Sequence, residues 1–207
     1  MWGSLVFAYM LVSRTAYVLG IGLTLSQQDR HQRYTRRYGT DEAYRRFRLM
    51  SSLLMLNDGT AFVAVTVLST NTMVLPVNRI LQIVVGTVIA ALGIGIKAWA
   101  TARLGADSWY WHNFFVPSEP VSPDPPGPYR YMKNPMYVVG YLQTYGFALM
   151  CASWPGMIAG AYMQASILVF NQLVEKPHLQ GLRHRAGRRP GDPGGDEFES
   201  GAAQRLG

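Results

Sequence analysis

Long uninterrupted runs of apolar residues divide the chain into segments that are each long enough to cross a lipid bilayer. About 20 apolar residues in a helix span a hydrocarbon core about 30 Å thick, and the runs lack the period-two alternation that a membrane β-barrel requires. A helix also satisfies its own backbone hydrogen bonds in lipid. The pattern therefore predicts an all-α fold, a multi-pass transmembrane helical bundle with about five spans. The predicted spans cover residues 4–25, 50–75, 80–102, 136–153 and 155–174.

Arginine is concentrated between the first two predicted spans. Seven arginines lie between residues 30 and 48, whereas the turn between the second and third spans contains only Arg79. Because arginine-rich loops stay in the cytoplasm, five crossings predict an outside N-terminus and place the loop 103–135 and the C-terminus inside. The first apolar run is expected to be a span and not a signal peptide, since it is long and no basic region precedes it. A site formed by these segments is expected to face the cytoplasm.

The composition fits a membrane protein. Of the 207 residues, 49% are hydrophobic and 15% are charged, whereas soluble domains carry about 25% charged residues. The net charge of +7 would also suit nucleic acid, but the basic residues lie between the apolar spans, where they suit anionic lipid headgroups. We therefore expect a membrane lipid and the bilayer as partners, no nucleic acid and no metal. The single cysteine, Cys151, forms no internal disulfide, and the sequence leaves the oligomeric state open.

The chain divides into three parts. Residues 1–79 hold the first two spans and the basic loop, and residues 80–179 hold the last three spans with the most unusual polar segments. Residues 180–207 are rich in glycine, arginine and acidic residues and contain almost no apolar ones. They cannot bury enough surface to fold alone, so this part is expected to be a disordered tail.

Four polar residues lie inside predicted spans: Arg14, Asn57, Asp58 and Lys97. Such side chains are costly in lipid and are expected to face protein or water. We expect Arg14 to pair with Asp58, or Lys97 to reach the cytoplasmic edge, and we interpret these residues as structural.

The sequence around Asn134-Pro135 has the signals of a helix start. Asparagine is a good N-cap and proline suits the first helical position, so the fourth span is expected to begin here. Arg130 and Lys133 precede it, and with the positive end of the helix dipole they would suit a carboxylate or a phosphate. The alternative is a basic pair that only anchors the helix.

A tight turn after residue 153 predicts that the fourth and fifth spans form an antiparallel hairpin. The start of one and the end of the other then lie at the same membrane face, which brings Glu175 and His178 close to residues 130–137. A carboxylate there would suit a cation or an amine. The alternative is a solvated glutamate at a helix end, or one paired with Lys176.

His112 lies among aromatic residues at a predicted membrane boundary. Such residues suit an interfacial belt, and His112 is either an acid–base group or a polar residue at the interface. The aromatic residues are Trp109, Tyr110, Trp111, Phe114 and Phe115.

Two motifs in the second half of the chain resemble the phospholipid methyltransferase family. They read GPYRYMKNPMYVVGYLQTYGFALMCAS at residues 127–153 and VEKPHL at residues 174–179. Ala91-Leu92-Gly93 in the third span is similar to an Ala-Leu-Gly that the phospholipid enzymes place against their cofactor. The resemblance makes residues 80–179 the methyltransferase core. Phosphatidylethanolamine N-methyltransferases are the nearest branch, and isoprenylcysteine carboxyl methyltransferases are more distant.

The resemblance implies an integral-membrane methyltransferase that binds S-adenosylmethionine among its last three spans, with Glu175 holding the amino group of the cofactor. The family usually has two acidic residues where this chain has Glu175-Lys176. The carboxyl methyltransferases commonly have His-Pro where it has Asn134-Pro135, which favours the phospholipid branch. The cofactor-binding residues that the resemblance implies are Ala91, Leu92, Gly93, Arg130, Asn134, Pro135, Tyr137, Gly140, Glu175 and Lys176.

The function that the resemblance implies is N-methylation of the amine headgroup of phosphatidylethanolamine or a related phospholipid. The attacking amine must be neutral, so His112, His178 or Glu175 is a candidate base, and Arg130 with Lys133 would hold the lipid phosphate. One alternative is carboxyl methylation of prenylcysteine or another lipophilic acid, which needs no base. The other is a non-catalytic membrane protein that binds lipid.

Overall fold

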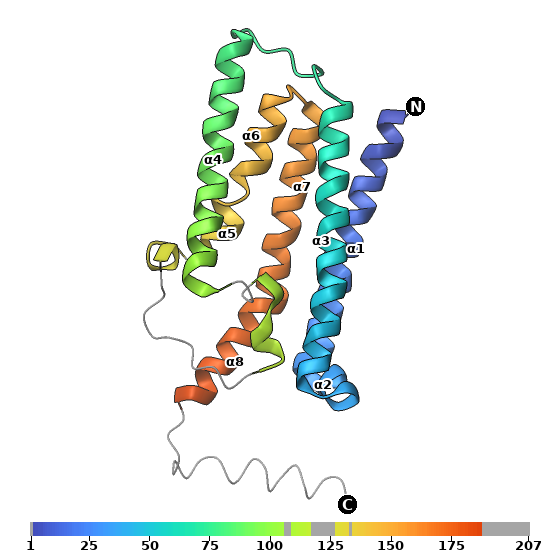
Figure 1. Ribbon diagram of the computed structural model, residues 1–207, viewed down its shortest axis with the longest axis vertical. Helices are drawn as coiled ribbons and strands as arrows, with labels where there is room; N and C mark the ends of the chain where they lie inside the picture. The colour runs from blue at the N-terminus through green and yellow to red at the C-terminus, as the bar shows by residue number, and fades with distance from the viewer. Residues whose placement is uncertain (1, 106–108, 117–126, 133, 188–207) are drawn as a thin grey trace, which may run out of the picture.

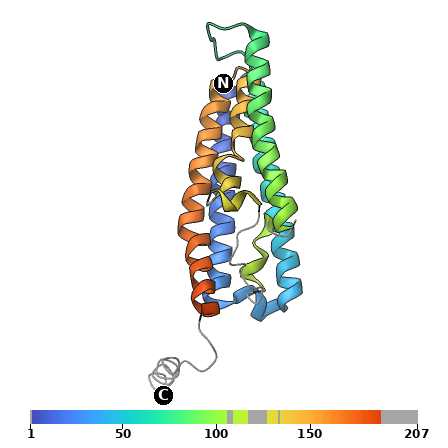
Figure 2. The same ribbon diagram turned by 90° about the vertical axis from the view of Figure 1, so that its left-hand side faces the viewer.

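The computed structural model describes residues 2–105, 109–116, 127–132 and 134–187. This part of the chain is helical without strands, which confirms the predicted fold class. Figures 1 and 2 show an elongated bundle whose long helices run along its longest axis. The helices are α1 (Trp2–His31), α2 (Arg33–Tyr38), α3 (Thr40–Leu68), α4 (Arg79–Leu104), α5 (Pro135–Val138), α6 (Leu142–Met150), α7 (Trp154–Phe170) and α8 (Lys176–Gly187). Between them lie the 3₁₀ helices η2 (His112–Phe114) and η3 (Gly127–Arg130) and the π-helical turn η4 (Asn171–Glu175).

Four helices of the described chain are long and apolar enough to cross a membrane. They are α1, α3, α4 and the continuous helix Trp154–Leu182, which joins α7, η4 and part of α8. The fourth predicted span forms two shorter helices in series, α5 and α6, and these pack with α7 as the predicted hairpin (Figure 1). Large aliphatic side chains such as Leu19, Leu56 and Leu92 are more than half exposed on the bundle. These are the features of a multi-pass membrane protein.

Small residues allow α4 and α6 to approach each other closely. A Cβ atom at Gly93 would lie 2.4 Å from the backbone nitrogen of Gln143, and one at Gly146 would lie 2.4 Å from that of Ala90. Only a hydrogen atom fits at such distances, so the two helices pack backbone against backbone. Gly140 lies in the break between α5 and α6, where a Cβ would come 2.9 Å from the side chain of Lys97.

A buried ion pair connects α1 to α3, and its guanidinium also reaches α6 and α7. Arg14 donates from Nη1 to Oδ2 of Asp58 at 2.9 Å, which confirms the predicted pair. It also donates from Nη2 to the hydroxyl of Tyr141 at 2.9 Å and to the carbonyl of Met163 at 2.6 Å, and from Nε to Ser166 at 2.7 Å. Arg14 is 2% exposed. The pair therefore fixes four segments of the bundle relative to one another.

The segments that the sequence assigns to one membrane face gather at one end of the bundle. Figure 1 shows α2, η2 and α8 at this end, and the N-terminus, the connection between α3 and α4 and the turn before α7 at the other. The helix α8 continues to Gly187, so the first eight residues of the predicted disordered tail are helical. Leu182 is buried, and this apolar anchor lies beyond the point where the prediction ended the fold. Residues 188–207 lie outside the described residues.

Candidate functional site

The carboxylate of Glu175 accepts hydrogen bonds from three neutral donors. The hydroxyl of Tyr137 donates to Oε1 at 2.5 Å, and Nε1 of Trp111 donates to the same oxygen. Nδ2 of Asn171 donates to Oε2 from one turn earlier in the helix. The three donors come from α5, the η2 segment and η4, so three separate parts of the chain position this carboxylate.

Asn171 and Glu175 lie at the two ends of a π-helical turn. A π turn adds one residue to the helical repeat and is frequent at functional sites. It spans Asn171–Glu175, where it connects the apolar α7 to the polar α8. The carboxylate is half-buried as a result, at the end of the span and not free in solvent.

The helix start at Pro135 lies beside this carboxylate, as the hairpin predicts. Pro135 is the first residue of α5 and Asn134 is its N-cap residue, as predicted, but the side chain of Asn134 makes no capping hydrogen bond. Its side chain donates from Nδ2 to Oδ1 of Asn171 at 2.8 Å, because the tertiary contact with η4 replaces the local cap. The helix α5 is a single turn, so it supplies little of the macrodipole that the predicted anion site needs. Arg130 is exposed, and Lys133 lies outside the described residues.

The charge of Glu175 has no cationic partner among the residues that the structure describes. Nζ of Lys176 donates instead to Oε1 of Gln172 at 2.7 Å, one turn back along the helix. A carboxylate offers about four acceptor positions, and the three donors leave one of them open. The site therefore has room for one further donor.

Tyr129 lies near the carboxylate, on η3. Burial and then the negative charge of Glu175 raise the pKa of Tyr129 to about 12. The phenol therefore stays protonated at neutral pH and keeps its hydrogen as a donor. The segment η3 is held against α4, since the position of a Cβ at Gly127 lies 2.8 Å from Cγ of Arg103.

His178 is buried, and both of its ring nitrogens have partners. Nδ1 lies 2.8 Å from Oδ1 of Asp29, and Nε2 lies 3.3 Å from the carbonyl oxygen of Asn113. The ring stacks on Phe114 with the centroids 3.7 Å apart. These contacts join α8 to α1 and to the η2 segment, so His178 has no free nitrogen directed at a substrate.

His112 is half-buried in η2, directly after Trp111 in the chain. Its ring meets that of Tyr44 edge to face, with the centroids 4.6 Å apart. No hydrogen bond engages its ring nitrogens within the described ranges. Of the two candidate histidines, His112 is therefore the one whose ring nitrogens remain available.

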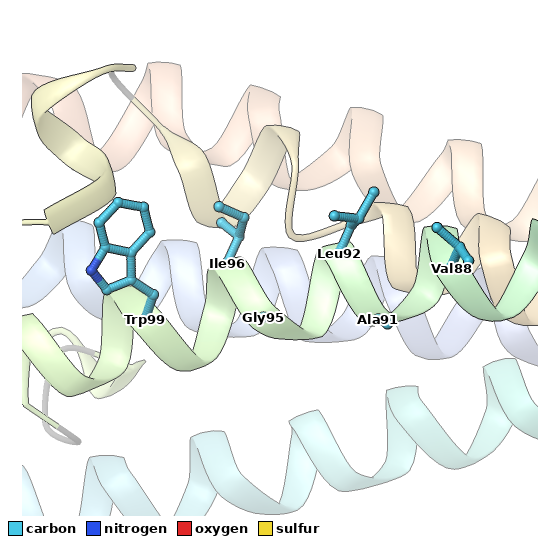
Figure 3. A pocket seen from close by; sticks show the side chains of 6 residues that line it. All are labelled: Val88, Ala91, Leu92, Gly95, Ile96 and Trp99. Atoms are coloured by element: carbon cyan, nitrogen blue, oxygen red, sulfur yellow. The ribbon is translucent and has the colours of Figure 1, made fainter.

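The three candidate cofactor residues on α4 have different surroundings. Ala91 and Leu92 line a shallow apolar depression on the outer face of α4 (Figure 3). Gly93 is buried against the backbone of Gly140 and Gln143. None of the described contacts joins these three residues to Glu175. The depression is completed by Val88, Gly95, Ile96 and Trp99.

Two of the three donors to Glu175 were not predicted from the sequence as site residues. Asn171 carries a signal, since it lies four residues before Glu175 at the same end of the span, which is the spacing of side chains on one helix face. Trp111 was predicted only as part of an aromatic belt. Its contact with Glu175 joins residues that lie far apart in the chain, and the sequence offers no signal for it.

Comparison with known proteins finds similarity to phospholipid methyltransferases. A family model described as phospholipid methyltransferase matches residues 81–182. The chain is 30% identical over 196 residues to the phosphatidylethanolamine N-methyltransferase of Talaromyces marneffei. The aligned region covers 88% of this chain and 20% of that protein. It is also 30% identical over 188 residues to the enzyme of that name from Coccidioides posadasii, covering 86% of this chain and 19% of the relative. The chain thus spans about a fifth of the length of the curated relatives it matches. No solved structure matches it significantly.

Proposed function

The chain belongs to the phospholipid methyltransferase family, and we propose that it transfers a methyl group from S-adenosylmethionine to the amine headgroup of phosphatidylethanolamine or a related phospholipid. The observation that carries this proposal is the carboxylate of Glu175, which three neutral donors position and no described cation neutralises. The names of the relatives support an amine as the acceptor.

The residues around Glu175 fit the amino group of such a cofactor. The open acceptor position on the carboxylate suits an ammonium, and a charge-assisted hydrogen bond there is roughly twice as strong as a neutral one. Tyr137 and Asn171 hold the carboxylate in place before the ligand arrives. Bound there, S-adenosylmethionine would supply a methyl group on a positively charged sulfur, which is an electrophile for a neutral amine.

The main task of the protein is then to orient the acceptor and to exclude water. Trp111 packs edge to face on Phe170, with the ring centroids 5.3 Å apart, and on Phe47, with the centroids 6.3 Å apart. Phe115 packs on Phe47 with the centroids 5.1 Å apart. These aromatic side chains form an apolar surface beside the carboxylate. The phenol of Tyr137 donates to the carboxylate, and Tyr129 lies near it.

The headgroup amine must lose a proton before it attacks. His112 is the better candidate to accept that proton, because its ring nitrogens are available whereas those of His178 contact Asp29 and Asn113. His178 then acts as a positioning residue that holds α8 against α1. Gly93 contributes by allowing α4 to approach α6, and Ala91 and Leu92 face the side from which a lipid arrives.

We also infer that the site faces the cytoplasm. The arginine-rich connection between α1 and α3 lies at the same end of the bundle as α8 (Figure 1), which directly follows Glu175 in the chain. Arginine-rich connections stay on the cytoplasmic side. This orientation is supported by charge alone.

The test is to incubate membranes that contain the protein with methyl-labelled S-adenosylmethionine and to identify the labelled product. A labelled N-methyl phospholipid supports the proposal. A labelled methyl ester of a prenylated cysteine or a lipophilic acid supports the second enzymatic alternative. Cofactor binding without any labelled lipid identifies a non-catalytic protein. Membranes containing the Glu175→Gln variant serve as the matched control.

A further inference from the structure

Lys97 on α4 has no anionic partner in the part of the chain that the structure describes. Nζ of Lys97 lies 5.0 Å from the ring centroid of Tyr141 and 5.8 Å from that of Trp109. No carboxylate and no hydrogen-bond acceptor contacts it in the ranges that the structure describes. An ammonium has three donors to satisfy, and an ionisable group in a membrane span marks a functional site. Among the described residues, Lys97 therefore lacks an anionic partner.

The surroundings of this ammonium are fixed by contacts of their own. The hydroxyl of Tyr141 accepts a hydrogen bond from Nη2 of Arg14 at 2.9 Å, and Nε1 of Trp109 donates to Oγ1 of Thr101 at 2.6 Å. The stem of Lys97 packs at Gly140, where a Cβ would come within 2.9 Å of Cγ and Cε. Two anchored rings and a glycine thus position the ammonium, which attracts the faces of the rings electrostatically.

The charge of Lys97 remains uncompensated although a second cation lies nearby. Arg14, which holds Tyr141, is itself neutralised by Asp58 at 2.9 Å. On the other side of the α5–α6 segment, Glu175 is contacted by neutral donors only. The interior therefore contains one anion and one cation, each without a charged partner among the described residues.

The two uncompensated charges flank the same short segment. Tyr137 on α5 contacts Glu175, and Tyr141, in the break between α5 and α6, contacts Lys97. Because the proposed function assigns Glu175 to the ammonium of the cofactor, the acceptor would complement the remaining charge, that of Lys97, with an anionic group beside its reacting amine. The headgroup of an amino phospholipid has this form, because a short ethanolamine chain joins its amine to a phosphodiester.

The position of α4 favours a ligand that arrives from the bilayer. Its principal contacts are with α5, α6 and η3, and Figure 1 shows it at the edge of the bundle. The side chains of Leu92 and Trp99 on its outer face are 56% and 41% exposed. A lipid that moves along this helix reaches Lys97 about two turns before the helix ends at Leu104.

We propose that Lys97 binds the phosphodiester of the acceptor phospholipid and thereby places its amine at the site beside Glu175. This assignment rests on the proposed function. It makes Lys97 a determinant of substrate specificity, because an amine that lacks the neighbouring phosphate would lose this contact.

The experiment compares wild type, Lys97→Met and Lys97→Arg as purified full-length chains in mixed micelles. The substrates are phosphatidylethanolamine and a diacyl amine of matched chain length without a phosphate group. Lys97→Met should raise the KM for phosphatidylethanolamine about tenfold to a hundredfold, the effect of losing one charged hydrogen bond. Its KM for the phosphate-free amine and its Kd for S-adenosylmethionine should equal those of wild type. Lys97→Arg should keep the KM for phosphatidylethanolamine within a few fold.

The matched control is Arg79→Gln, which removes a positive charge from an exposed position at the opposite end of the same helix and should change neither constant. An unchanged KM in Lys97→Met overturns the assignment, as does a wild type that methylates both amines with the same KM. A weaker Kd for S-adenosylmethionine with an unchanged lipid KM overturns it too, since the anion bound by Lys97 is then the carboxylate of the cofactor. If Lys97→Met does not fold, the KM values of wild type for the two amines still test the assignment. If wild type methylates no lipid amine, the proposed function fails and the assignment of Lys97 fails with it.

Discussion

The hydroxyl of Tyr137 donates a hydrogen bond to Oε1 of Glu175 at 2.5 Å and so joins the start of α5 to the end of η4. The two residues are 38 positions apart in the chain, and the hairpin of α6 and α7 returns the chain to the same end of the bundle. The contact fixes one carboxylate oxygen and leaves an acceptor position on the other.

Glu175→Gln should weaken the binding of S-adenosylmethionine about tenfold to a hundredfold. The amide keeps the shape of the side chain but removes its charge, and a hydrogen bond to a charged group contributes about 1.5–3 kcal/mol. The measurement is a binding isotherm on detergent-solubilised protein. Glu42→Gln is the matched control, because Glu42 pairs with Arg45 and Arg46 on the surface of α3. Equal affinity in Glu175→Gln and wild type would show that this carboxylate does not hold the cofactor.

Tyr137→Phe should weaken cofactor binding by less than Glu175→Gln does. The carboxylate keeps its charge and two of its donors, Trp111 and Asn171, and loses only the phenol that orients it. The control is Tyr145→Phe, which removes a phenol that donates to Gln164 at 2.7 Å on the neighbouring helix. The same isotherm measures both variants, and equal effects of the two would mean that the contact with Glu175 has no special role.

Topology explains how much of this site the sequence predicts. The hairpin brings Glu175 to Tyr137 because two predicted spans of similar length, 136–153 and 155–174, share a tight turn, in which the hydroxyl of Ser153 accepts from the backbone of Gly156 at 2.8 Å. That argument uses only lengths and a turn signal, which local sequence contains. It cannot give the contact with Trp111, because that depends on how a separate loop folds back over the helix end.

Two departures from prediction lie in the α5–α6 segment. Asn134 occupies the N-cap position, but its side chain contacts Asn171 on η4 and does not cap the helix. The predicted fourth span breaks around Gly140, where a Cβ would lie 2.2 Å from the carbonyl oxygen of Met136 and 2.9 Å from the side chain of Lys97 on α4. Neither feature is encoded in hydrophobic periodicity.

Asp58→Leu should destabilise the protein by about 3–5 kcal/mol, because it leaves the buried guanidinium of Arg14 without its counter-charge. Thermal unfolding in detergent measures the effect. The double variant Arg14→Met, Asp58→Leu should be more stable than the single one, since no unpaired charge remains. A double variant that is less stable than Asp58→Leu would indicate that the contacts of Arg14 with Tyr141 and Ser166 contribute more than the ion pair does.

Cysteine labelling should place the arginine-rich connection in the cytoplasm. In a Cys151→Ala background, Thr40→Cys lies in this connection and Val74→Cys lies at the other end of the bundle, where Val74 is 88% exposed. An impermeant thiol reagent added to intact cells should label Val74→Cys and leave Thr40→Cys unlabelled until the membrane is permeabilised. The reverse pattern would put the site outside the cell.

The two histidines should respond differently to substitution. His112→Gln should lower kcat about a hundredfold to ten-thousandfold, the range for losing a general base, with cofactor affinity unchanged. His178→Gln should instead lower the unfolding temperature, because it loses the contact with Asp29 and the stacking on Phe114, and Asp29→Asn should show the same effect. The measurements are kcat at saturating lipid and thermal unfolding of each variant. If His178→Gln lowers kcat to the level of His112→Gln at unchanged stability, the proton is accepted at His178. The contact of its Nδ1 with Asp29 then orients a base, in the way that a carboxylate orients a catalytic imidazole.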